Sequence, residues 1–108
     1  MSEGIASYQD FWPYYLREHA SPRTRAIHFL GTGLVLVSAL AFALTGKLLW
    51  LIILPFAGYG PAWFAHFFVE GNKPATFKYP FWSLISDFRM FFTWLFGGLS
   101  DELRKAGV

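Results

Sequence analysis

Apolar residues in this chain form two long runs that contain few polar residues. Ala26–Gly46 contains no charged residue, and Leu48–Val69 contains none either. About 20 consecutive apolar residues are enough to cross the hydrocarbon core of a bilayer. Only Gly46 and Lys47 separate the two runs, which leaves room for a tight turn. We therefore predict membrane spans at 22–45 and 48–70, joined as an antiparallel transmembrane hairpin.

Glycine and proline residues in the two runs lead us to expect close helix contacts and a departure from regular helical geometry. Gly31 and Gly33 lie early in the first run, where small residues allow a neighbouring helix to approach closely. The second run contains residues that bend or interrupt helices, and we expect a kink or local unwinding there. These residues are Pro55, Gly58, Gly60 and Pro61.

Amphipathic segments flank the hairpin on both sides. Residues 7–20 show an aromatic stripe at helical spacing, which is typical of an interfacial helix or of a helix that packs on a bundle. Residues 81–96 form a third helical pattern, about 24 Å long at the usual helical rise, and thus short for a perpendicular span. We expect that helix to be tilted or interfacial, followed by a short polar C-terminal helix. The predicted fold is an all-α membrane protein with a single domain over 1–108.

Composition supports a lipid environment and excludes several classes of function. Hydrophobic residues make up 55% of the chain and charged residues only 15%, against about 25% in an ordinary soluble domain. The absence of cysteine excludes thiolate metal sites and cysteine nucleophiles. The net charge of +2, without a basic patch, gives no reason to expect a nucleic-acid partner. The N-terminal residues do not form a secretory signal, because Glu3 and Asp10 stand where positive charge is expected.

The distribution of basic residues predicts the orientation. More basic residues lie before the first run and after the second than at Lys47, so the N-terminus and residues 71–80 are predicted to be cytoplasmic. The expected location is a multi-pass position in a bacterial inner membrane, or in the endoplasmic reticulum membrane of a eukaryote.

Histidines occupy matching positions in the two predicted spans. His28 lies nineteen positions before Lys47 and His66 nineteen positions after it. Both are therefore roughly 28 Å from the turn along their helices. His19 ends the aromatic stripe shortly before the first span, and Glu70 follows one helical turn after His66. All three histidines can thus converge near the cytoplasmic surface.

Each of these polar residues also has an ordinary interpretation. A single histidine at a membrane boundary is commonly an interfacial residue, Glu70 can face water at a helix end, and Asp87 can pair with Arg89. Together, however, the residues favour a metal site, because imidazole suits iron, zinc, copper and nickel, and an added carboxylate favours non-haem Fe(II). No nucleophilic serine motif or phosphate-binding glycine loop offers a competing chemistry.

Several of these residues, in this order, resemble the small membrane proteins typified by the fungal 2-hydroxy fatty acid dioxygenase, which acts in the metabolism of phytosphingosine to odd-numbered fatty acids. The similarity covers nearly the whole chain and is most specific from His66 to Thr76. The segment from Phe81 to Met90, which includes Asp87, is more similar to the short prokaryotic-type members. The residues that carry the resemblance are Tyr15, His19, His28, Gly31, Gly58-Tyr59-Gly60, His66-Phe67-Phe68-Val69-Glu70 and Pro74-Ala75-Thr76.

The resemblance implies an Fe(II)-dependent membrane dioxygenase that shortens 2-hydroxy fatty acids by one carbon, in fatty acid alpha-oxidation. Its partners would be the 2-hydroxy fatty acid, dioxygen and membrane lipid. His19, His28 and His66 would be metal ligands, Glu70 a further ligand or a group that orients His66, and Asp87 a second catalytic carboxylate. The alternative is a non-enzymatic lipid-binding or scaffolding membrane protein, in which the polar residues only orient helices.

Overall fold

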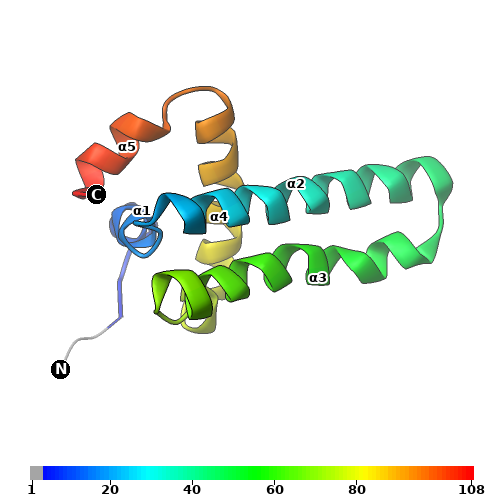
Figure 1. Ribbon diagram of the computed structural model, residues 1–108, viewed down its shortest axis with the longest axis horizontal. Coiled ribbons are helices and arrows are strands. Elements are labelled where there is room, and N and C mark those ends of the chain that lie inside the picture. The colour runs from blue at the N-terminus through cyan, green and yellow to red at the C-terminus, as the bar shows by residue number, and fades with distance from the viewer. Residues whose placement is uncertain (1–3) are drawn as a thin grey trace. The chain divides into compact units, whose positions relative to one another are not determined.

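The computed structural model describes residues 4–108, and within that range every regular element is helical. The predicted all-α class is therefore confirmed, including the apolar hairpin and the short C-terminal helix (Figure 1). The first three residues of the predicted 1–108 domain lie outside the described range. The elements are α1 Tyr8–Arg17, α2 Pro22–Thr45, α3 Leu48–Phe64, a π-helix η1 Ala65–Glu70, a 3-10 turn η2 Ala75–Phe77, α4 Pro80–Leu95 and α5 Leu99–Ala106.

The described chain divides into two compact units. One consists of Ser21–Pro74 and contains the α2–α3 hairpin, which continues into η1. The other combines the described residues up to Ala20 with Ala75–Val108, and contains α1, η2, α4 and α5.

Local sequence explains where the hairpin helices begin and end. The Ser21 side chain caps α2 by accepting a hydrogen bond from the Arg23 N–H, and Pro22 occupies the first helical position. Gly46 ends α2 with a left-handed φ of 67°, a conformation that glycine adopts at little cost. The predicted spans 22–45 and 48–70 match the two long helical segments. The prolines in α3 lie inside a continuous helix, and the departure from α-helical geometry comes later, at η1.

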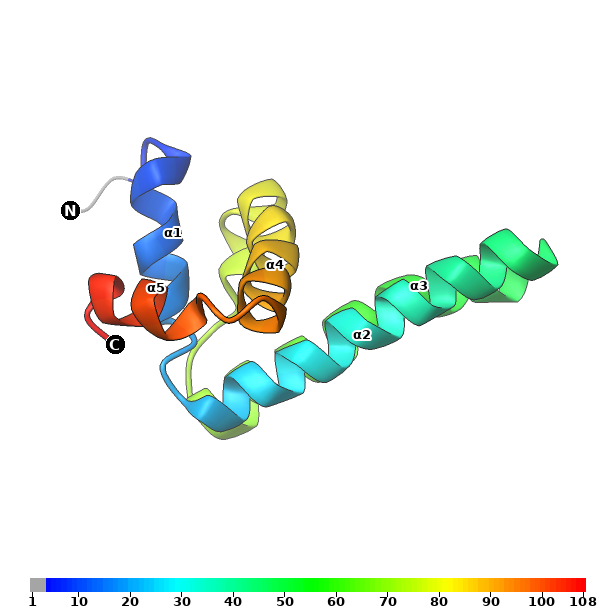
Figure 2. The same ribbon diagram turned by 90° about the horizontal axis from the view of Figure 1, so that it is seen from above.

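At Gly31 the two hairpin helices approach each other closely. A Cβ atom on Gly31 would lie 3.1 Å from the carbonyl oxygen of Ala57 and 3.4 Å from the Pro61 Cβ. Gly33 has open space around it, so only the first of the two predicted contact glycines contributes. Figure 2 shows α2 and α3 following one another along their length.

The hairpin buries small and polar side chains and exposes large apolar ones. Its buried residues include Thr24, Thr32 and Ser38, and the two hairpin histidines. Both helices are long and apolar enough to cross a membrane, yet only 22% of the most apolar window in the first and 11% in the second is buried. The exposed apolar side chains include Leu30, Leu34, Val37, Leu40, Leu44, Leu48, Leu49, Leu51, Ile52 and Phe56.

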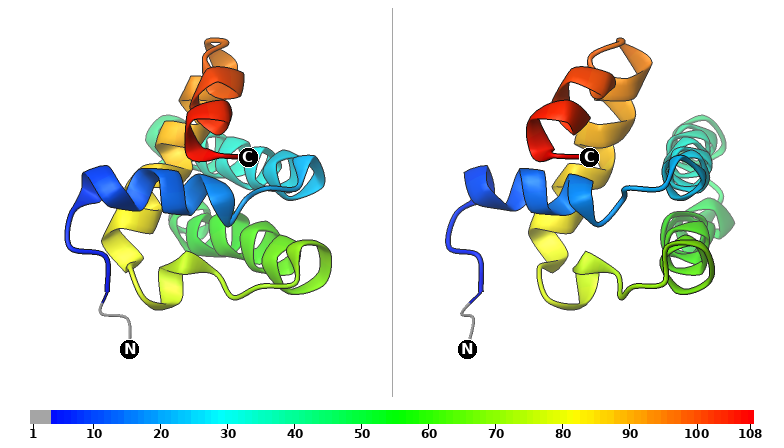
Figure 3. Two further views of the ribbon diagram at one scale, coloured as in Figure 1. Left: turned by 90° about the vertical axis from the view of Figure 1, so that its left-hand side faces the viewer. Right: turned by 60° about the vertical axis from the view of Figure 1, so that its left-hand side comes forward.

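The other unit contains α1, α4 and α5 (Figure 3). Aromatic rings of α1 and α4 pack against one another in it. Ser7 caps α1, and the predicted stripe places Phe11 and Tyr15 in the interior. The Trp12 indole N–H donates to Glu102 Oε1 at 2.8 Å, which ties α5 to α1. The Arg89 guanidinium lies 4.0 Å from the centre of a Trp12 ring. On α4 the buried residues are Ser83, Ser86 and Met90, whereas Phe81, Leu84, Ile85, Phe92 and Leu95 are exposed.

Candidate metal centre

His28 and His66 meet across the hairpin. Their Nε2 atoms are 3.2 Å apart, and the two ring planes are nearly perpendicular, at 82°. Only 5% of His28 and 2% of His66 is accessible to solvent. His28 comes from the second turn of α2 and His66 from η1. The equal spacing of the two residues from Lys47 predicts that their side chains lie close together, and in the structure they do.

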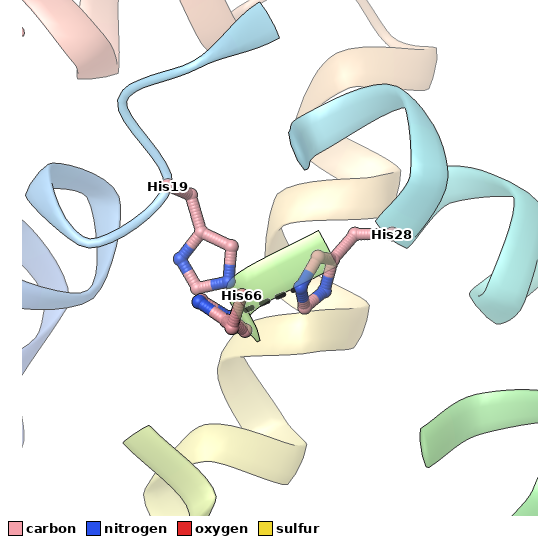
Figure 4. A group of neighbouring side chains, drawn as sticks. All are labelled: His19, His28 and His66. Atoms are coloured by element: carbon pink, nitrogen blue, oxygen red, sulfur yellow. Dashed lines mark hydrogen bonds between the residues drawn. The ribbon is translucent and has the colours of Figure 1, made fainter. Parts of the chain in front are cut away.

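His19 supplies a third buried imidazole. It follows the end of α1, where its Nδ1 lies 2.6 Å from the Tyr15 carbonyl oxygen and its ring centre 4.1 Å from that of Tyr15. Figure 4 labels the three side chains and marks the contact between His28 and His66. His19, His28 and His66 form a buried group that could hold a metal ion.

The end of η1 fixes the orientation of the His66 ring. The Gly71 and Asn72 backbone N–H groups both donate to the His66 carbonyl oxygen, at 2.8 Å and 2.9 Å. Gly71 has a left-handed φ of 78°, which turns the chain back toward the histidine. The Asn72 Oδ1 atom then lies 2.6 Å from His66 Nδ1. The sequence alone does not predict this contact, because nothing in a Gly-Asn pair indicates that the side chain returns to a residue six positions earlier.

Glu70 has a different neighbour from the one expected. Its Oε1 accepts a hydrogen bond from the Ser21 backbone N–H at 3.0 Å, so the carboxylate satisfies an unpaired donor at the start of α2. Asn72 occupies the place on the His66 ring that the sequence analysis gave to Glu70. The group of possible ligands contains the three histidines and not Glu70. A role for Glu70 as ligand or catalytic group remains a prediction.

Asp87 accepts a short hydrogen bond from the buried Tyr15 hydroxyl. Burial raises the pKa of Asp87 from 3.8 to about 7, and the hydrogen bond from Tyr15 opposes this rise. Burial, followed by the charge of Asp87, raises the pKa of Tyr15 well above 10. Arg89 contacts Trp12 and approaches Glu102 at 3.9 Å. The sequence analysis did not link Tyr15 to Asp87, because seventy-two positions separate them.

The donor set fits a first-row transition metal. Two nitrogen ligands at about 2.1 Å from one ion, at right angles, are separated by roughly 3 Å, close to the distance between the His28 and His66 Nε2 atoms. Imidazole binds iron, zinc, copper and nickel, so three histidines define a metal site without choosing the metal.

A family model described as 2-hydroxy-palmitic acid dioxygenase Mpo1-like matches residues 5–99. The chain belongs to the Mpo1-like family. The match includes all three histidines and Asp87, and it confirms the resemblance found in the sequence. No curated protein matches the chain, and no solved structure matches it either.

Membership of the Mpo1-like family implies a 2-hydroxy fatty acid dioxygenase. The buried cluster of His19, His28 and His66 is consistent with a metal site in such a protein. In this Mpo1-like chain the histidine cluster is thus a candidate location for the chemistry that the family description names.

Proposed function

We propose that this protein is an Fe(II)-dependent membrane dioxygenase that shortens 2-hydroxy fatty acids by one carbon. The observation that carries the proposal is the buried group of His19, His28 and His66 in a chain of the Mpo1-like family. Three histidines are costly to bury in an apolar hairpin protein unless they are used, which favours the enzyme over the scaffold.

The three histidines would hold the iron. Bound Fe(II) would supply the positions at which the carboxylate and hydroxyl oxygens of the substrate meet dioxygen. His66 is held by Asn72, and His19 by the Tyr15 carbonyl, so two of the three rings keep their orientation before any metal binds. Such preorganisation lowers the cost of assembling the site.

The two carboxylates would have different roles. Asp87 can hold or release a proton near neutral pH, because burial raises its pKa to about 7. The Tyr15 hydroxyl fixes the position of that carboxyl group. Glu70 anchors the start of α2 through Ser21, and thereby supports the helix that carries His28.

The hairpin would place this site in a membrane. Both helices are long and apolar enough to span, and their exposed faces are rich in leucine, isoleucine and phenylalanine. In water such faces would be covered by protein, whereas in a bilayer they contact lipid tails. A fatty acid whose head lies at the interface could then reach the histidines without leaving the membrane.

The proposed reaction balances without an external reductant. The bond between the carboxyl carbon and the hydroxyl-bearing carbon breaks, and one dioxygen is consumed. The products are the fatty acid shortened by one carbon, carbon dioxide and water. All four electrons that dioxygen accepts come from the hydroxy acid.

The decisive experiment measures iron content and turnover together. Protein loaded anaerobically with Fe(II) in detergent should bind near-stoichiometric iron and, with oxygen, convert a 2-hydroxy fatty acid to the acid one carbon shorter. His28→Ala and His66→Ala should each lose most of the iron and the activity. Ser38→Ala, at a buried position further along α2, should retain both.

The substrate comparison separates this function from others. The unhydroxylated fatty acid should not be turned over, because it lacks the second oxygen next to the carboxylate. Iron-loaded protein that leaves every 2-hydroxy acid unchanged would contradict the proposed activity. Protein that binds no metal would instead support the scaffold.

A further inference from the structure

Asn72 is the residue outside the histidine group that most directly controls a histidine ring. Its Oδ1 lies 2.6 Å from His66 Nδ1, at the end of η1. An amide oxygen only accepts hydrogen bonds, so His66 Nδ1 must carry the proton in this arrangement. The Nε2 atom of His66 then carries no proton, so it can accept the hydrogen bond that joins it to His28 Nε2 at 3.2 Å.

The backbone reinforces this arrangement. The His66 carbonyl accepts from both the Gly71 and the Asn72 N–H, so residue 72 is tied to residue 66 through main chain and side chain at once. An ordinary α-helical ending would satisfy the His66 carbonyl from residue 70. The wider turn of η1 places the Asn72 side chain beside the ring instead.

We propose that Asn72 is a positioning residue that locks His66 in the Nδ1–H tautomer and so presents Nε2 to the metal. The proposal rests on the proposed function for its metal, but the tautomer exists in the metal-free protein. His19 uses the same device with a different acceptor, since its Nδ1 faces the Tyr15 carbonyl oxygen at 2.6 Å. Two imidazoles are thus oriented by oxygen acceptors, and the third, His28, faces His66 through Nε2.

The first test uses Co(II) as a spectroscopic stand-in for Fe(II). Asn72→Leu removes the acceptor at similar size and should weaken Co(II) binding about 10–100-fold, the usual effect of losing a group that orients a ligand. Asn72→Asp keeps an oxygen acceptor and should bind Co(II) within a few-fold of the unaltered protein. Lys73→Leu places the same apolar side chain at the next, exposed position and should change nothing.

The second test needs no metal. Nitrogen NMR of the metal-free protein with labelled histidine should show His66 protonated at Nδ1, and Asn72→Leu should give a mixture of tautomers. A His66 signal protonated at Nε2 in the unaltered protein would overturn the proposal, as would full Co(II) affinity in Asn72→Leu. If the unaltered protein binds no Co(II), the proposed function loses its metal, and the NMR result alone decides the role of Asn72.

Discussion

Asp87 places an ionisable carboxyl group in the interior beside a tyrosine. Burial raises its pKa to about 7, so the folded protein keeps a proton there at pH values where the unfolded chain, with a pKa near 3.8, has lost it. The folded state therefore binds more protons between pH 4 and 7, and its stability falls as the pH rises through that window.

Asp87→Asn should flatten this pH dependence. Asparagine keeps an oxygen that accepts the Tyr15 hydrogen bond but has no proton to lose. Above pH 7 the variant should unfold at a higher temperature than the unaltered protein, and near pH 4 the two should be similar. Thermal unfolding in detergent at several pH values measures the difference. If the unfolding temperatures of the two proteins change with pH in the same way, Asp87 is not the group responsible for the pH dependence.

At the level of the elements, a glycine allows α2 to pack closely on α3. Gly31 lies three residues after His28, where α2 approaches the backbone of α3. Gly31→Val should force the helices apart, destabilise the protein by about 1–3 kcal/mol and lower metal affinity by separating His28 from His66. Thermal unfolding and a Co(II) titration measure the two effects.

Gly33 offers a matched control for that prediction. It lies on the same helix, and a side chain there would meet open space. Gly33→Val should therefore leave metal binding unchanged and cost little stability. Equal damage from both substitutions would show that helix propensity, and not the close approach of the helices, explains the loss.

The elements also show which parts of the site were predictable. Hydrophobic runs and a turn at Gly46 define the hairpin, and helical rise alone brings His28 and His66 to one depth. The π-helix forms because the Gly71 N–H donates to the His66 carbonyl oxygen, which in an α-helix would accept from the Glu70 N–H. No local sequence pattern predicts which of the two N–H groups does so. For the same reason the sequence does not reveal that Asn72 contacts the His66 ring. The contacts of Tyr15 with Asp87 and of Trp12 with Glu102 join distant segments, which periodicity cannot pair.

At the scale of the whole molecule, the hairpin and α4 reverse the polarity of a soluble protein, whereas α1 keeps an apolar buried face that includes Phe11 and Leu16. Serine, threonine and histidine are buried, whereas leucine and phenylalanine face outward on α2, α3 and α4. The sequence predicts the two long apolar runs, but for α4 its helical pattern could not tell whether the apolar side chains turn inward or outward.

The hairpin makes a topological prediction that labelling can test. Lys47 and Lys73 are exposed at opposite ends of the two helices, and the chain has no native cysteine. Single cysteines at these two positions should react with a membrane-impermeant reagent from opposite sides of sealed vesicles, with Lys73→Cys on the cytoplasmic side. Labelling of both from one side would rule out a transmembrane hairpin.

The meeting of His28 and His66 also imposes an order on biosynthesis. The two residues are thirty-eight positions apart, with the whole turn of the hairpin between them. During translation the first histidine would enter the bilayer while the second is still inside the ribosome. If these histidines hold a metal, the site would be complete only after both helices have been inserted and the segment through Asn72 has emerged. Newly made chains that have finished membrane integration would thus be able to bind iron, whereas chains that stall before that point would not.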